Sequence, residues 1–161
     1  LPYREGFVKN RYVGRTFIQP SDGARHADVK RKHIANRALV EGKRIVLIDD
    51  SIVRGTTSDR IVRMLRDAGA KEVHMRVSSP PFLWPCYFGT DIPACDQLIA
   101  YKRSVDEICK IIGADSLAYL RTDRLEEMVD GLGICKGCFT GKYPVTAVVF
   151  LPYLLFRTSG P

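Results

Sequence analysis

The sequence contains no hydrophobic run long enough to cross a membrane as a helix. Its longest apolar stretch, residues 145–156, is shorter than the roughly 18 residues that a span needs, and it contains a proline. An apolar secretory signal is also missing, because Arg4, Glu5 and Lys9 occupy its place. We therefore expect a cytoplasmic protein with no membrane partner.

Repeats and low-complexity tracts are absent as well. The chain has 161 residues, of which 45% are hydrophobic, and this excludes disorder, a collagen-like fold and a disulfide-rich miniprotein. The length suits one domain with a real core. Since the first residue is Leu1 and the first methionine is Met64, we expect a segment of a longer protein.

The positive charge of the chain is concentrated near its start. Residues 1–45 hold 11 Lys and Arg against 4 Asp and Glu, whereas the remaining residues hold 14 of each. Such a patch can neutralise a nucleic acid, an acidic membrane or a small polyphosphate. It can equally be a solvated surface without a partner, and charge alone does not decide between these alternatives.

Local patterns predict a strand, a helix and a second strand in succession. Residues 44–48 form a short apolar run typical of a strand buried on both faces. Residues 58–68 have helical spacing, and residues 72–78 alternate as in a strand. The order predicts a parallel βαβ unit. The expected buried face of the helix consists of Ile61, Met64, Leu65 and Ala68.

Shorter elements are predicted after this unit. A helix over residues 104–112 begins with a capping box of Ser104 and Glu107, and residues 116–120 fit a third strand. A similar pair, Asp123 and Glu126, predicts a helix over residues 123–129. Residues 1–40 are expected to be loop with short elements, and the tail after residue 131 has no clear assignment.

The connection between the first strand and the helix carries the chemistry. Residues 46–58 read VLIDDSIVRGTTS, so Asp49 and Asp50 stand at the carboxyl end of a strand, where open α/β sheets bind ligands. The loop then enters a helix, whose backbone N–H groups suit a phosphate. Gly55 allows close approach of the backbone. Hydroxyl donors are available from Ser51, Thr56, Thr57 and Ser58.

The two carboxylates cannot bind a phosphate themselves. They can accept hydrogen bonds from vicinal hydroxyls or bind Mg²⁺, directly or through water. A sugar phosphate with a free diol therefore suits both the aspartate pair and the loop that follows it. The simpler alternative is a pair of capping aspartates at an ordinary turn. The order of all thirteen residues favours the functional interpretation.

This segment closely resembles the phosphoribosyl pyrophosphate signature of type I phosphoribosyltransferases. Four flanks narrow the resemblance to glutamine phosphoribosylpyrophosphate amidotransferases: residues 6–20, 29–37, 78–81 and 138–144. The resemblance implies an α/β fold, a type I phosphoribosyltransferase-like parallel sheet with flanking helices, incomplete at its N-terminal side. It further implies a partial transferase domain over residues 1–131, a C-terminal segment over residues 132–161 with a divergent apolar tail, and no counterpart of the family's N-terminal glutaminase domain.

The resemblance also implies the reaction and its residues. Family members convert phosphoribosyl pyrophosphate and glutamine-derived ammonia to 5-phosphoribosylamine, the first step of purine biosynthesis, with purine nucleotides as feedback inhibitors. By this resemblance we expect a homo-oligomer and no nucleic-acid partner. Asp49, Asp50, Lys32 and Arg15 are the implied catalytic residues, with Mg²⁺ at Asp49 and Asp50. The implied substrate-binding residues are Ser51, Arg54, Gly55, Thr56, Thr57, Ser58, Lys9 and Lys30.

The cysteines include a C-x-x-C pair, Cys135 and Cys138, whose spacing suits a metal or a redox pair. By the resemblance, Cys86, Cys135 and Cys138 match ligands of the [4Fe–4S] cluster that some family members carry. A cubane needs four thiolates, so the fourth is expected upstream of this chain. Cys109 is expected to be a small buried hydrophobe and Cys95 to have no role.

Two other functions deserve comparison. A phosphoribosyltransferase-like regulator would bind the same ligand as an effector and contact DNA through the basic segment. It would need neither the flexible, substrate-covering loop that residues 6–18 resemble nor the cysteines that match cluster ligands. A type I transferase acting on a nucleobase shares the thirteen-residue signature, but the flanking segments do not fit it.

Overall fold

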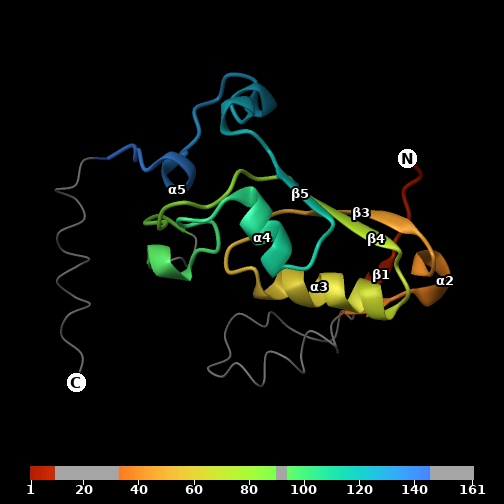
Figure 1. Ribbon diagram of the computed structural model, residues 1–161. Coiled ribbons are helices and arrows are strands. Elements are labelled where there is room, and N and C mark those ends of the chain that lie inside the picture. The colour runs from red at the N-terminus through yellow and green to blue at the C-terminus, as the bar shows by residue number, and fades with distance from the viewer. Residues whose placement is uncertain (10–32, 90–93, 146–161) are drawn as a thin grey trace.

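The computed structural model describes residues 1–9, 33–89 and 94–145. Its central sheet has three parallel strands in the order β3 (Arg44–Asp49), β4 (Glu72–Val77) and β5 (Ser116–Tyr119). Helix α3 (Thr56–Asp67) joins β3 to β4, and α4 (Val105–Ile111) precedes β5 (Figure 1). The predicted parallel βαβ unit and third strand are confirmed.

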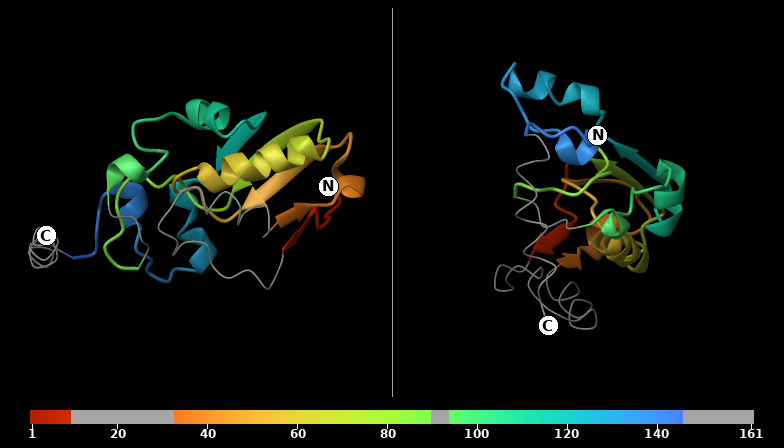
Figure 2. Two further views of the ribbon diagram at one scale, coloured as in Figure 1. Left: turned by 90° about the horizontal axis from the view of Figure 1, so that it is seen from below. Right: turned by 90° about the vertical axis from the view of Figure 1, so that its left-hand side faces the viewer.

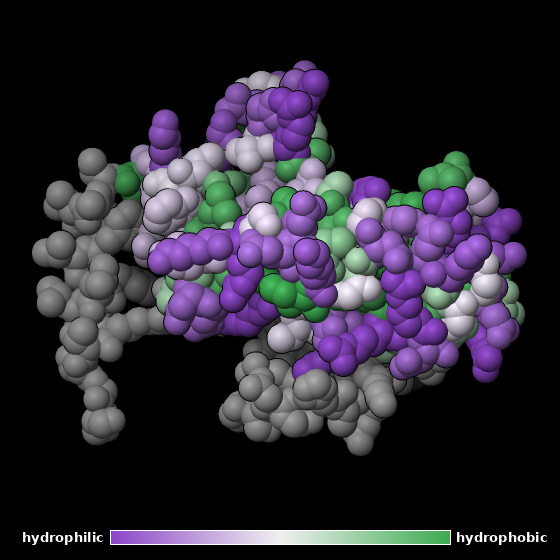
Figure 3. Space-filling model, viewed as in Figure 1, coloured by the Kyte–Doolittle hydropathy of each residue, from purple (hydrophilic) through white to green (hydrophobic). Residues whose placement is uncertain are grey.

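Both helices cover the same face of the sheet (Figures 1 and 2). Val73, Met75 and Val77 of β4 point toward them and are buried. Val73 packs with Val62 and Leu65 of α3, whereas Met75 and Val77 pack in a cluster that includes Ile108 of α4. The outward side of this helical layer is mainly hydrophilic, with hydrophobic residues showing between the polar side chains (Figure 3).

The opposite face of β3 is open. Val46 is 42% exposed and Ile48 is 72% exposed, so the prediction of a strand buried on both faces is wrong. The physical reason is that the helical layer formed by the described residues covers only one side of the sheet. The alternating side chains on the other side therefore meet solvent.

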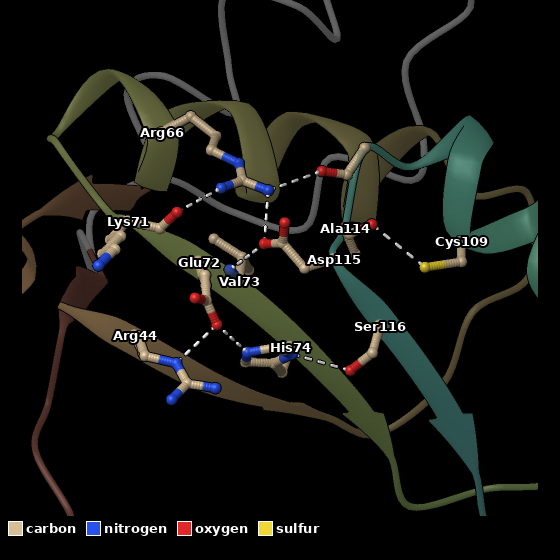
Figure 4. Close-up of polar contacts among 11 residues, drawn as sticks. Arg44, Arg66, Lys71, Glu72, Val73, His74, Cys109, Ala114, Asp115 and Ser116 are labelled. Carbon is tan, nitrogen blue, oxygen red and sulfur yellow. Dashed lines mark hydrogen bonds and ion pairs between the residues drawn. The ribbon is translucent and has the colours of Figure 1, made fainter.

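A polar chain crosses that open face and links the strands (Figure 4). Arg44 Nε donates to Glu72 Oε2 at 2.6 Å, and His74 Nε2 lies 2.9 Å from the same oxygen. His74 Nδ1 lies 2.9 Å from Ser116 Oγ. The hydrogen bonds from Arg44 and then His74 lower the pKa of Glu72. One residue of β3, two of β4 and one of β5 thus link the three strands by side-chain contacts.

Helix α3 begins two residues earlier than predicted, at Thr56, directly after Gly55. Its buried face consists of Ser58, Val62 and Leu65. Val62 was absent from the predicted face, and Met64 is only half-buried. The predicted stop is confirmed, because Gly69 adopts a φ of +91° just beyond the helix.

Helix α4 has the predicted capping box: Glu107 N donates to Ser104 Oγ at 3.3 Å, and Ser104 N donates to Glu107 Oε2 at 2.7 Å. The predicted helix over residues 123–129 is wrong. Two short 3₁₀ turns, η3 (Thr122–Arg124) and η4 (Glu127–Val129), stand there instead. The carboxylate of Asp123 accepts two hydrogen bonds from Arg121, at 3.0 and 2.5 Å, and so does not cap a helix.

The N-terminal part adds an antiparallel pair, β1 (Phe7–Lys9) with β2 (His33–Ala35), followed by the short helix α2 (Arg37–Val40). Val40 is buried in the cluster that also contains Val62 of α3. The remaining short elements are η2 (Cys95–Gln97) and α5 (Gly137–Thr140). Among the residues described, no helix combines the length and hydrophobicity needed to cross a membrane.

Candidate functional site

The carboxyl end of β3 carries the two adjacent carboxylates. Asp49 is the last residue of the strand and is half-buried, whereas Asp50 is exposed. Asp50 N donates to Asp49 Oδ1 at 3.0 Å, and Ser51 Oγ donates to Asp50 Oδ1 at 3.1 Å. From the end of β4, Ser78 N donates to the carbonyl of Asp49 at 3.0 Å. Two neighbouring strand ends therefore fix the aspartate pair at the ligand-binding edge of the sheet.

Burial raises the pKa of the Asp49 carboxyl, the N–H of Asp50 lowers it, and the negative charge of Asp50 raises it further. The two adjacent carboxylates repel one another when both are charged. A divalent cation or a row of hydroxyl donors would relieve this repulsion, and Mg²⁺ prefers such oxygen ligands. The pair can therefore hold either a metal or a diol.

The phosphate loop, which we define as residues 50–55, ends at the N-terminus of α3. Gly55 has a φ of +79°, a conformation that favours glycine, and as the N-cap residue it has no side chain to cap the helix. The first N–H groups of a helix lack intrahelical partners and attract anions. Thr56 and Thr57 are exposed beside these groups, whereas Ser58 is only 2% exposed. The accessible hydroxyls on the helix are thus those of the two threonines.

A second segment, residues 97–99, contacts this loop. A Cβ atom at position 55 would lie 2.3 Å from Cδ1 of Ile99, so a side chain there would force Ile99 to shift. Arg54 Nη2 donates to Gln97 Oε1 at 2.7 Å. The structure therefore brings together the loop residues that the sequence predicted, but it also adds Gln97, Ile99 and Ser78, which the sequence analysis missed. Only Ser78 had a signal, its position directly after a parallel strand.

The predicted basic residues are placed only in part. Lys9 lies in β1, where its backbone pairs with that of His33. Arg15, Lys30 and Lys32 lie outside the described residues. Their predicted role at a pyrophosphate stays a prediction.

The cysteine-bearing tail packs against the loop that follows β4. The carbonyl of Cys138, in α5, accepts hydrogen bonds from Leu83 N and Trp84 N, each at 3.0 Å. Tyr143 OH donates to the carbonyl of Pro85 at 2.6 Å. Cys86 is the next residue, so segments about fifty positions apart in the sequence lie together.

Burial raises the pKa of the Cys138 thiol, and the nearby Cys86 and Cys135 raise it further. Every cysteine lies in the described part of the chain, and none forms a disulfide. The described residues contain no group of three or more His, Cys, Asp or Glu side chains arranged to hold a metal ion. The thiols are thus neighbours without forming a metal-binding group in this arrangement.

Cys109 and Cys95 were predicted to be outside any site. Cys109 is half-buried, and its Sγ donates to the carbonyl of Ala114 at 3.2 Å. Burial also raises the pKa of this thiol. The prediction of a small buried hydrophobe is therefore only partly right, because the Cys109 side chain is half-buried and its thiol donates a hydrogen bond. Cys95 begins η2, the turn that contains Gln97.

No protein-family model matches the chain. It is 55% identical over 150 residues to the amidophosphoribosyltransferase of Archaeoglobus fulgidus, covering 91% of the chain and 33% of that protein. It is 52% identical over 147 residues to the chloroplastic amidophosphoribosyltransferase of Glycine max, covering 90% of the chain and 26% of that protein. The chain thus spans about a third or less of the length of these two relatives.

A solved structure agrees with these relatives. The glutamine phosphoribosylpyrophosphate amidotransferase from B. subtilis, complexed with ADP and GMP, superposes with a TM-score of 0.76 at 53% identity. The match covers 91% of this chain and 33% of that one. The chain is therefore a relative of the amidophosphoribosyltransferases over about nine-tenths of its own length, and its sheet has their type I phosphoribosyltransferase-like fold.

Proposed function

We propose that the site binds the ribose 5-phosphate part of phosphoribosyl pyrophosphate, and that the intact protein converts this substrate and ammonia to 5-phosphoribosylamine. The observation that carries the proposal is the position of Asp49 and Asp50 shortly before the N-terminus of α3, where the N-cap residue is Gly55. The carboxylates suit a diol, and the helix N-terminus with Thr56 and Thr57 suits a phosphate. A pentose phosphate joins these two functions in one molecule.

The reaction breaks the bond between C1 of the sugar and pyrophosphate, so positive charge grows on the sugar and negative charge on the leaving group. Asp49 and Asp50 hold the sugar hydroxyls, while the loop holds the distal phosphate and so fixes C1 for attack. Asp49 and Asp50 are also the residues that would hold Mg²⁺, which would neutralise charge on the departing pyrophosphate. Lys32 and Arg15 are the cations predicted for the same group. Ammonia competes with water at C1, so water must be excluded.

The cluster is part of the proposal too. Cys86, Cys135 and Cys138 are three ligands of a [4Fe–4S] cluster in the intact protein, and a fourth thiolate comes from elsewhere. Support comes from the packing of the tail on the loop that bears Cys86 and from the mutual influence of these thiols. The three thiols have to come closer together for such a group to form, since they are not arranged to hold a metal ion among the described residues.

Control by purine nucleotides follows from the same relationship. The B. subtilis relative is complexed with ADP and GMP, and a nucleotide shares its ribose phosphate with the proposed substrate. We therefore expect purine nucleotides to inhibit the reaction. Glutamine as the ammonia source, a homo-oligomer and a cytoplasmic location stay predictions, and the soybean relative is named chloroplastic.

The test uses the intact protein with ammonia, Mg²⁺ and phosphoribosyl pyrophosphate. Replacing both Asp49→Asn and Asp50→Asn should abolish formation of 5-phosphoribosylamine while the unfolding transition stays close to wild type. Asp67→Asn, the same change at the exposed far end of α3, is the matched control and should retain full activity. Near-normal turnover by the double variant would refute the assignment.

A further inference from the structure

Residues 97–99 hold three consecutive residues of the phosphate loop. Gln97 Oε1 accepts a hydrogen bond from Arg54 Nη2 at 2.7 Å. Ile99 N donates to the carbonyl of Val53 at 2.8 Å. The side chain of Ile99 also fills the space that a Cβ at Gly55 would need, since its Cδ1 lies 2.3 Å from that position. The segment therefore contacts the loop in three ways: a side-chain hydrogen bond to Arg54, a backbone hydrogen bond to Val53 and packing against Gly55.

The middle residue of this segment points elsewhere. Leu98 is fully buried and packs with Phe82, with Val53 and with Cys138 and Phe139 of α5. Ile99, by contrast, belongs to the cluster that contains Met75, Val77 and Ile108. The segment is therefore anchored on both sides, in the sheet core and on the cysteine-bearing tail. It supports a loop whose last residue, the N-cap Gly55, has no side chain to cap α3.

The chemistry of Gln97 suits an anion site. Arg54 is exposed, so an unrestrained guanidinium would lose conformational freedom on binding a ligand. An amide oxygen orients the guanidinium beforehand, yet it leaves the positive charge uncompensated. A carboxylate at the same position would cancel that charge. The neutral partner therefore preserves Arg54 for a negatively charged ligand.

We infer that Gln97 and Ile99 are positioning residues: they hold Arg54 and Gly55 in the conformation that receives the phosphate of a phosphoribosyl ligand, and Leu98 ties this support to the tail. The identity of the ligand rests on the proposed function. The support of the loop does not, because it consists of contacts within the chain.

The experiment uses Gln97→Met in the intact protein. Methionine has a similar length but cannot accept the hydrogen bond from Arg54. We expect the KM for phosphoribosyl pyrophosphate to rise about tenfold, the loss of one charge-assisted hydrogen bond, while kcat stays within about twofold. Asp96→Asn, at the exposed neighbouring position in η2, is the matched control and should change neither constant.

A second measurement follows hydrogen exchange of the backbone amides of residues 53–55 without ligand. We expect exchange about tenfold faster in Gln97→Met than in Asp96→Asn, because an opened loop exposes its amides. Wild-type exchange together with a wild-type KM would overturn the inference. If the wild-type protein does not bind phosphoribosyl pyrophosphate, the proposed function fails, and the exchange result alone then decides whether Gln97 positions the loop.

Discussion

The carboxylate of Asp115 joins Arg66 of α3 to the backbone of β4: one of its oxygens lies 2.6 Å from Arg66 Nη2 and 2.6 Å from the nitrogen of Val73 (Figure 4). Arg66 also donates to the carbonyl of Lys71 at 3.1 Å. The Val73 N–H and then Arg66 lower the pKa of Asp115. Asp115, which directly precedes β5, thus connects α3 with β4 through a single carboxylate oxygen.

Asp115→Ala should lower the free energy of unfolding by about 1–3 kcal/mol, because the Val73 N–H and Arg66 lose their partner. Urea denaturation at pH 7 measures the loss, with the exposed Asp96→Ala as control. The pKa of Asp115 is below its ordinary 3.8 in the folded chain, so this stabilisation is present above that pH and disappears as the pH falls through the folded value. The difference between wild type and Asp115→Ala should therefore shrink on acidification, and a constant difference would contradict the assignment.

Gly55→Ala should destabilise the chain more than Gly42→Ala. Both glycines have positive φ, +79° and +69°, so each substitution costs roughly 1–2 kcal/mol in the backbone. No atom lies within 4 Å of a Cβ at position 42, whereas Ile99 obstructs one at position 55. Overpacking adds about 1–3 kcal/mol. Urea denaturation of both variants checks this. Equal losses of unfolding free energy would show that the Ile99 side chain moves aside without cost.

Ser104→Ala should destabilise α4 by about 1 kcal/mol, because the Glu107 N–H loses its capping acceptor. Ser104→Asn retains a capping oxygen and should stay near wild type. Thermal unfolding of the two variants provides the measurement. Equal losses for alanine and asparagine would mean that the capping hydrogen bond does not stabilise the helix.

In protein freed of metal, iodoacetamide at pH 7.5 should alkylate Cys135 at least about tenfold faster than Cys138, since only the thiolate reacts. Cys135 is exposed, whereas burial and neighbouring thiols raise the pKa of Cys138. Cys109, whose pKa burial also raises, serves as a slow internal reference. Peptide mass spectrometry follows each site. Equal rates at Cys135 and Cys138 would contradict the described positions of these thiols.

In intact protein purified without oxygen, iron and sulfide analysis tests the cluster. We expect iron and sulfide in equal amounts, and protection of Cys86, Cys135 and Cys138 from alkylation until the metal is removed. Because metal binding contributes to folding, its removal should loosen the tail before the phosphate loop. A protein with one zinc, or with no metal, would contradict the proposal.

Most elements of the sheet could be predicted because their signals are local. Alternation in residues 72–78, the capping box at Ser104 and the stop at Gly69 each involve residues close in sequence. The predicted helix over residues 123–129 failed because Arg121 takes the carboxylate of Asp123. The open face of β3 could not be foreseen, because the composition of a strand does not reveal what covers it.

The candidate site also contains residues that local sequence signals predict and residues that they do not. The order of residues 46–58 predicted the aspartate pair and the phosphate loop, since a strand, a turn and a helix follow one another there. Gln97 and Ile99 gave no such signal, because a polar residue followed by two apolar ones is ordinary in sequence. Their role depends on contacts with Arg54 and Gly55 that only the folded chain creates.

The contact between the phosphate loop and residues 97–99 has a consequence during synthesis. Arg54 and Gln97 are 43 positions apart, and ribosomes add roughly 5–20 residues per second, so the loop emerges several seconds before its support. Strands β3 and β4 with α3 are complete at Val77, well before that point. A nascent chain stalled before Ile99 should therefore hold a formed strand–helix–strand scaffold with an incompetent loop, and ligand-dependent protection from protease should begin only after Ile99 has left the ribosome.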